Sequence, residues 1–294
     1  MKTSHSLKKV YNIVSIIVLI ALAICFVFPL YWIVTGAFKT PVSINSPVPD
    51  WIPKELVMDN FKKLFSRQTA PIFELGFIKG PQAPAAVRWM LNTVFMAIMA
   101  MVLTCLSASM AGYVLAKKRF HGRVLLFTLI VCAMALPKQV ILIPLIREMS
   151  SLKLYNTIWA VILPTVGWPF GVFLMKQFSE GIPTEMLEAA RIDGASEFRT
   201  FTDIVFQMVK PVVGALAIFT FINSWNDYFM QLIMLSSTSN LTISLGIAKL
   251  QAENSTDFGL IMAGATLAAA PILIVFIALQ KYFTKGITLG AVKG

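Results

Sequence analysis

Uncharged apolar runs long enough to cross a membrane are the feature that most restricts the fold of this chain. No acidic or basic side chain occurs from Val10 to Phe38, from Trp89 to Ala116 or from Phe258 to Gln280. A helix of about 20 such residues crosses the hydrocarbon core of a bilayer. Because lipid offers no hydrogen-bond partners, the backbone N–H and C=O groups of each run must bond to one another within a helix. With 57% hydrophobic and only 13% charged residues, the chain is predicted to be an all-α, polytopic membrane protein.

We expect six transmembrane helices, at about residues 10–38, 89–116, 124–146, 157–178, 209–235 and 258–281. The third reaches spanning length only by tolerating Lys138. The first is much longer than the roughly 7–15 apolar residues of a signal peptide. We therefore expect it to be retained as the first membrane helix.

Basic residues predict how these spans are oriented. Lysines precede the first span, four basic residues and no acidic one occupy 117–123, and lysines follow the sixth span. The positive-inside rule assigns these segments to the cytoplasm, which puts both termini there. The segment 39–88 is then an outer loop. It carries seven basic and four acidic residues, but long loops cross the membrane largely regardless of their charge.

The cytoplasmic loop 181–203 differs from the others because it is acidic. Six acidic and four basic residues lie between Lys176 and Lys210, whereas a loop that only fixed the topology would be basic. We expect two short helices, with a break at Asp193-Gly194 and with Ser196 capping the second. In the first helix, Glu188 and Arg191 are spaced to pair. This pattern indicates a surface that contacts another protein; the alternative is a solvated connector.

Several classes of function do not fit the sequence. The basic residues flank apolar runs instead of forming one basic face, so we expect no nucleic acid as a partner. Cys25, Cys105 and Cys132 have no metal-ligand spacing, so no metal site is expected. No phosphate-binding G-x-x-x-x-G-K-[ST] motif is present, so the chain is not expected to hydrolyse ATP. The scarcity of ionisable residues within the spans argues against a proton-coupled carrier.

The acidic loop resembles a family motif. Glu188-Ala189-Ala190, followed by Gly194, resembles the EAA loop of ABC importer permeases, although Phe206-Gln207 stands where that family usually has Leu-Pro. Further segments are similar to the maltose-type, carbohydrate branch of the family, and the C-terminal segment is similar to its G-type subunit. These segments are "LYNTIWAVILP" (154–164), "PFGVFLMKQF" (169–178), "SWNDY" (224–228) and "LGAVKG" (289–294).

This resemblance implies an ABC type I importer permease fold in a prokaryotic cytoplasmic (inner) membrane. It implies that the loop is a coupling helix docked on an ABC ATPase, and that the tail 285–294 makes a second contact; a frayed terminus is the alternative for the tail. The implied docking residues are Glu188, Ala189, Ala190, Asp193 and Gly194 in the loop and Gly290, Ala291, Val292, Lys293 and Gly294 in the tail.

The implied partners are a second, homologous permease subunit that completes a heterodimer, two copies of the ATPase and an extracytoplasmic sugar-binding protein. The chain itself would bind no cofactor, since ATP and Mg would be held by the partner ATPase. The implied substrate is a sugar or an oligosaccharide. The basic outer loop favours an acidic, uronate-containing one, whereas the alternatives are glycerol phosphate or another polyol, or a secondary carrier.

One polar stretch in the fifth span could contact such a substrate. Amide and carboxylate groups hydrogen-bond sugar hydroxyls, and aromatic faces stack on sugar rings. The alternative is a polar and aromatic belt at the membrane surface. The residues of this stretch are Asn223, Trp225, Asn226, Asp227 and Tyr228.

Overall fold

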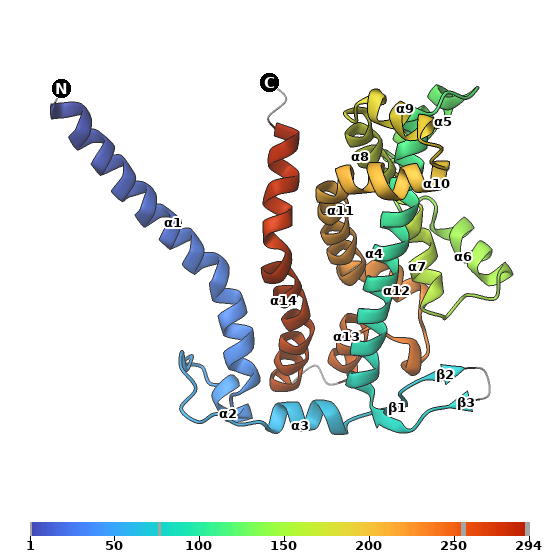
Figure 1. Cartoon of the computed structure of the whole chain (residues 1–294). Coiled ribbons are helices and arrows are strands. Elements are labelled where there is room, and N and C mark those ends of the chain that lie inside the picture. Colours follow the sequence, from blue (N-terminus) through green and yellow to red (C-terminus); the bar gives the residue numbers. More distant parts are fainter. Residues whose placement is uncertain (1, 76–77, 254–256, 292–294) are drawn as a thin grey trace. The chain divides into compact units, whose positions relative to one another are not determined.

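The computed structural model describes residues 2–75, 78–253 and 257–291, and these are mostly helical (Figure 1). They form two compact units. The first comprises Met1–Thr69 and Ile247–Ala269, and the second comprises Ala70–Gly246 and Ala270–Gly294. The expectation of a mainly helical protein is confirmed.

The first unit is built around the helices α1 (Lys2–Ala37) and α3 (Asp59–Ser66) and the first part of α14 (Phe258–Ala291). The buried amide of Asn60 donates hydrogen bonds of 2.9 Å to the carbonyl oxygens of Ala37 and Lys39. These carbonyls lie at the last residue of α1 and just beyond it, where no helical N–H group reaches them. Asn60 therefore fixes α3 to the end of α1.

The second unit is organised around α4 (Ala85–Lys117), against which α7 (Trp159–Val166), α8 (Pro169–Glu180) and α11 (Phe206–Asn226) pack. Small residues allow α4 and α8 to approach closely. A Cβ atom added to Gly112 would lie 2.6 Å from the Cβ of Met175. Small residues are the usual means by which membrane helices pack tightly.

The remaining elements are short. They are α2 (Pro41–Ile44), α5 (Arg123–Ala133), α6 (Leu142–Ser151), α9 (Thr184–Ile192), α10 (Glu197–Thr200), a π-helix (Phe201–Val205), α12 (Tyr228–Met234), a 3-10 turn (Thr238–Asn240), α13 (Ile243–Glu253), and the strand pairs β1 (Thr69–Pro71) with β4 (Gln82–Pro84) and β2 (Glu74–Leu75) with β3 (Ile78–Lys79). The expected outer loop 39–88 thus contains α2, α3 and these four strands.

Within the part of the chain that the structure describes, five helical segments are long and apolar enough to cross a membrane. They are Tyr11–Ala37, Ala85–Lys117, Trp159–Glu180, Glu197–Asn226 and Phe258–Ala278.

Three of the six expected spans differ from a continuous helix. The expected third span, 124–146, is divided, because α5 ends at Ala133 and α6 begins only at Leu142. The expected fourth span, 157–178, is divided between α7 and α8 at Gly167-Trp168. The expected fifth span, 209–235, is helical from before Phe206 and stops at Asn226. There the Asp227 side chain accepts a hydrogen bond from the N–H of Met230 and starts α12 as its N-cap.

Candidate functional site

The acidic loop folds as the two short helices that its sequence predicts. Gly194 has a φ of +76°. Its N–H donates to the carbonyl of Arg191 at 3.0 Å, and the N–H of Ala195 donates to that of Ala190 at 2.9 Å. This is the Schellman arrangement that ends a helix at a glycine. The expected break at Asp193-Gly194 is therefore confirmed, and so is the cap, because the Ser196 hydroxyl accepts from the N–H of Arg199 at 3.3 Å.

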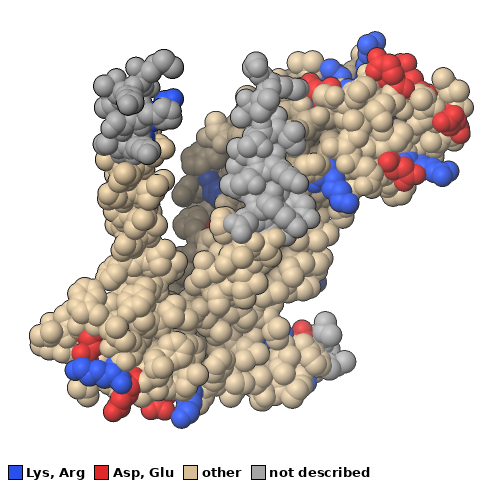
Figure 2. Space-filling view, turned by 60° about the vertical axis from the view of Figure 1, so that its left-hand side comes forward, with Lys and Arg blue, Asp and Glu red and all other residues tan. Residues whose placement is uncertain are grey.

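The residues expected to dock lie on the outside of this loop, with one exception. Glu188, Ala189, Asp193 and Gly194 are exposed, whereas Ala190 is buried beneath them. A groove of about 350 Å³ runs between α9 and α10, bordered by Ala189, Ala190 and Asp193 among others. The acidic and basic side chains over this loop form a charged end, in contrast to the largely apolar helix surfaces beside it (Figure 2).

Two large apolar side chains on the loop were missed by the sequence reasoning. Ile192 is 87% exposed and Phe198 is 73% exposed. Apolar anchors framed by charged residues are typical of a protein–protein contact. Charge counting alone could not find them, because each stands singly among polar neighbours.

The expected pairing of Glu188 with Arg191 is wrong. The Arg191 guanidinium instead pairs with the Glu197 carboxylate, with 3.2 Å between Nη2 and Oε1. The reason is the turn at Gly194, which brings the start of α10 back toward the end of α9. The pair therefore joins the two helices instead of bracing one of them.

Glu197 also joins the loop to the end of α4. Its carboxylate accepts a hydrogen bond from the ammonium group of Lys118 and lies 3.4 Å from the Tyr113 hydroxyl. Lys117 donates to the carbonyl oxygens of Ile182, at 2.6 Å, and Glu180, at 3.0 Å. The sequence reasoning assigned the lysines at 117 and 118 only to membrane topology. In the structure they attach the acidic loop to the central helix.

The Lys118 hydrogen bond lowers the pKa of the Glu197 carboxyl below its ordinary value of 4.5, with Arg191 adding to the effect. A lowered pKa means that the contact stabilises the loop above the ordinary pKa. That stability is lost as the pH falls through the lowered value. Since the Glu197 side chain is 60% exposed, the gain is small, of the order of 0–1 kcal/mol.

Replacing Glu197 with glutamine should therefore loosen α10 at pH 7. We expect faster amide hydrogen exchange in 197–200 in the variant than in the wild type. The two proteins should exchange alike well below pH 4.5, after correction for intrinsic rates, because the Glu197 carboxyl of the wild type is then neutral, as the glutamine of the variant always is. Glu188→Gln, which changes a neighbouring exposed carboxylate, is the matched control. If Glu188→Gln loosened α10 equally, the attachment through Glu197 would be refuted.

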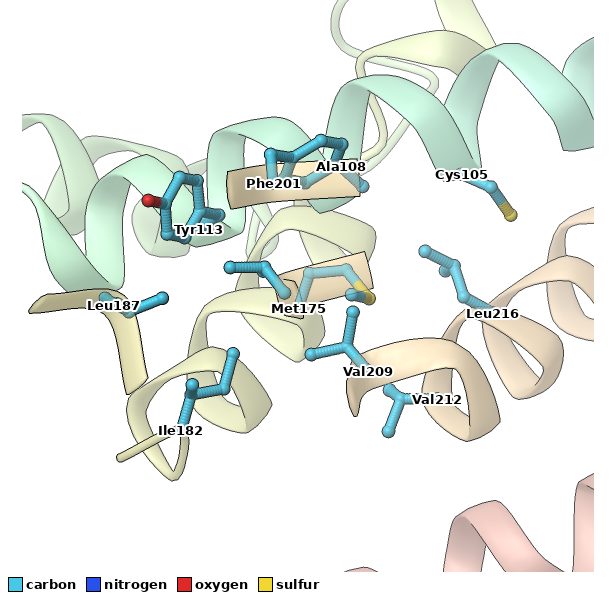
Figure 3. Close-up of a cluster of buried hydrophobic side chains, with 11 residues drawn as sticks. Cys105, Ala108, Tyr113, Met175, Ile182, Leu187, Phe201, Val209, Val212 and Leu216 are labelled. Atoms are coloured by element: carbon cyan, nitrogen blue, oxygen red, sulfur yellow. The ribbon is translucent and has the colours of Figure 1, made fainter. Parts of the chain in front are cut away.

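An apolar cluster continues from the loop into the membrane helices (Figure 3). Leu187 of α9 and Ile182 lie at one end of it, and Leu216 of α11 lies at the other. The remaining members are Cys105, Ala108, Tyr113, Met175, Phe201, Val205, Val209 and Val212. The cluster therefore packs α9 continuously against α4, α8 and α11, and close-packed interiors of this kind transmit strain.

The tail predicted to make a second contact is only partly described. Gly290 and Ala291 belong to the end of α14, whereas Val292, Lys293 and Gly294 lie outside the described residues. The tail contact therefore stays a prediction.

In the polar stretch of the fifth span, some residues are exposed, and others are buried or bonded to other residues of the chain. Asn223, Asn226 and Tyr228 are exposed, and the Asn226 amide donates to the carbonyl of Ile222 in its own helix. Trp225 is only 1% exposed and packs on Phe221, so the stacking face expected of it is covered. Asp227 caps α12 and is also ion-paired with Lys138.

Comparison with known proteins gives one family. The family described as "Binding-protein-dependent transport system inner membrane component" matches residues 106–289. The arabinooligosaccharides transport system permease protein AraQ of Halalkalibacterium halodurans is 34% identical over 270 residues, which cover 91% of each chain. The lactose transport system permease protein LacG of Rhizobium radiobacter is 31% identical over 286 residues, covering 97% of this chain and 98% of that protein.

A solved structure shares the fold. It is that of a bacterial ABC transporter involved in the import of the acidic polysaccharide alginate, with a TM-score of 0.75 over 94% of this chain and 97% of that one. The two sequences are only 19% identical, so the likeness concerns the fold. It confirms the ABC importer permease fold that the motifs implied.

Proposed function

Since the chain belongs to the inner-membrane components of binding-protein-dependent transport systems, we propose that it forms half of the translocation pathway of an ATP-driven oligosaccharide importer. It is a multi-pass membrane protein and a non-catalytic permease subunit of a sugar ABC importer, in which ATP hydrolysis belongs to a separate subunit. A second, homologous permease subunit supplies the other half in this proposal.

The observation that carries the coupling role is the exposed loop α9–α10, fixed to α4 through Lys117, Lys118 and Glu197. We propose that Glu188, Ala189, Ala190, Asp193 and Gly194 dock in a cleft of an ABC ATPase, present in two copies. ATP and Mg are bound there and not by this chain. The exposed side chains of Ile192 and Phe198 supply apolar contact area beside the charged residues.

The proposal places both termini and this loop in the cytoplasm. The basic segment 117–123 and the acidic loop contact each other through Lys118 and Glu197, which supports the same side for both. The positive-inside rule then makes that side cytoplasmic. An extracytoplasmic binding protein delivers substrate to the opposite side.

For the substrate, the names of the relatives support a sugar or an oligosaccharide, since they read arabinooligosaccharides and lactose. The basic outer loop supports an oligosaccharide that contains uronate. A polyol or polyol derivative is the second candidate. The relatives also include the osmoprotective compounds uptake permease protein GgtD of Synechocystis, which is 34% identical over 206 residues covering 69% of each chain.

The proposal predicts ATP-dependent uptake. The subunit would be co-purified with its partners, reconstituted in proteoliposomes and supplied outside with binding protein and labelled arabinan, galactan or galacturonan oligosaccharides. We expect uptake of one class when ATP is enclosed, and none with a non-hydrolysable analogue. Uptake that follows an imposed proton gradient without ATP would instead identify a secondary carrier.

A further inference from the structure

Two interrupted spans meet at an ion pair. Lys138 lies in the segment 134–141 between α5 and α6, and Asp227 lies between α11 and α12. Their Nζ and Oδ2 atoms are 2.6 Å apart. Figure 1 shows both interruptions, where α5 leads into α6 and α11 into α12. Sequence reasoning selected Asp227 but treated Lys138 only as a charge that the third span must tolerate.

The two partners are unequally exposed. The Asp227 side chain is 16% exposed, and its second oxygen, Oδ1, accepts the N–H of Met230 at 3.3 Å. The Lys138 side chain is 61% exposed. An ammonium group has three N–H donors, and Asp227 is the hydrogen-bond partner that the described residues provide to Lys138. Asp227 therefore holds the lysine, while the exposed ammonium group of Lys138 keeps further donors for a ligand.

A chain of hydrogen bonds gives the depth of the pair along α4. Gln231, one turn after Asp227, accepts from the Thr242 hydroxyl at 2.5 Å, and the N–H of Ile243 donates to the Thr93 hydroxyl at 2.8 Å. Thr93 is eight residues into α4, about 12 Å from its Ala85 end at 1.5 Å per residue. These bonds place Gln231 near Thr93, inside the apolar part of α4 and toward the end opposite the acidic loop, and the ion pair lies one helical turn from Gln231.

A charged group at such a depth does not face lipid. Ionisable residues in membrane segments face a bundle interior or a water-filled cavity and pair with one another. Non-helical backbone at membrane depth is tolerated only where it is buried or lines such a cavity. The residues 134–141 are exposed in this chain, so burial within the subunit is not the explanation. Discontinuous membrane helices commonly form substrate sites in transporters.

We propose that Lys138, positioned by Asp227, lines the translocation pathway and donates hydrogen bonds to oxygen acceptors of the passing oligosaccharide. The inference rests on the proposed transport function. Sugar hydroxyl and uronate carboxylate oxygens share this acceptor chemistry. A carboxylate forms the stronger, charge-assisted bond, so the two acceptors are separable by experiment.

The first test measures whether water reaches position 138. In the assembled transporter, with Cys25, Cys105 and Cys132 replaced by serine, Lys138→Cys is treated with a membrane-impermeant thiosulfonate. Leu129→Cys, on the apolar helix α5, is the control because Leu129 is 58% exposed without a charged partner side chain of its own. We expect labelling at 138 and protection at 129. Equal protection of both positions would overturn the proposal.

The second test separates the two acceptors. Uptake of a galacturonate trisaccharide and of its carboxyl-reduced, neutral counterpart is compared between wild type, Lys138→Gln and Lys138→Arg. Each variant is compared with the wild type on the same sugar, so that the preference of the binding protein cancels. Loss of a charge-assisted bond should raise KM for the acidic sugar about tenfold, with recovery in Lys138→Arg.

The outcomes of this second test are distinct. A selective loss for the acidic sugar identifies the carboxylate as the acceptor, and an equal loss for both sugars identifies hydroxyl oxygens. Unchanged KM for both, with normal uptake, refutes contact between Lys138 and substrate. Absence of ATP-driven uptake in the wild type would refute the proposed function instead. Asp227→Asn, which should reproduce a weaker form of the Lys138→Gln effect, checks the positioning role.

Discussion

Replacing Gly194 with leucine should reduce ATP-driven uptake roughly thirtyfold, which corresponds to about 2 kcal/mol of lost docking. Gly194 ends α9 with a φ of +76°, and a Cβ atom added there meets nothing within 4 Å inside the subunit. The leucine side chain would therefore project from the surface proposed to enter the ATPase cleft. The measurement is uptake per subunit in proteoliposomes, with the amount of membrane-inserted subunit determined in parallel.

Gly122 provides a matched control for this substitution. It has a φ of +84° in the turn before α5, and a Cβ atom there also meets nothing within 4 Å. Gly122→Leu therefore carries the same backbone strain, of the order of 1–2 kcal/mol, on a turn outside the proposed docking residues. We expect Gly122→Leu to retain most of the uptake. An equal loss in both variants would show that backbone strain, and not docking, explains the Gly194 effect.

The second large effect is expected from substitutions at Gly112. They should lower the stability of the fold and not the coupling to ATP hydrolysis. An added Cβ atom would lie 2.6 Å from the Cβ of Met175 and 2.7 Å from the backbone nitrogen of Lys176. Since backbone atoms of α8 cannot move aside as a flexible side chain can, α4 and α8 would have to separate. We expect Gly112→Ala to lower the free energy of unfolding by about 1–3 kcal/mol, and Gly112→Leu to yield little folded subunit.

Thermal unfolding of the purified subunit in detergent measures this effect. Gly167→Ala is the control, because a Cβ atom at Gly167 meets nothing within 4 Å and its φ is −80°. The control should unfold close to the wild-type temperature. If Gly112→Ala also unfolded there, the close packing of α4 on α8 would not be a source of stability.

The features that could be predicted from the sequence are those set by local chemistry. Uncharged runs predict where helices cross the membrane, and Gly194 and Ser196 predict a helix break and a cap, because each depends on a few neighbouring residues. The family motif in the loop, carried by Glu188 and Gly194, likewise lies within seven residues.

The features that could not be predicted depend on contacts between distant parts of the chain. Lys118 meets Glu197 across 79 positions, and Lys138 meets Asp227 across 89. Arg191 pairs with Glu197 and not with Glu188 because the turn at Gly194 brings Glu197 back toward Arg191. The burial of Trp225 depends on tertiary packing, which a polar and aromatic stretch does not reveal.

Purification of this chain from its native membranes in mild detergent, with identification of the accompanying proteins by mass spectrometry, tests the central claim most directly. We expect an ATPase carrying a phosphate-binding G-x-x-x-x-G-K-[ST] motif and a second permease to accompany the wild type and Gly122→Leu. With Gly194→Leu, the second permease should remain while the ATPase is lost. Recovery of the chain alone, or retention of the ATPase by Gly194→Leu at wild-type amounts, would contradict the account of this loop as the site that couples the permease to ATP hydrolysis.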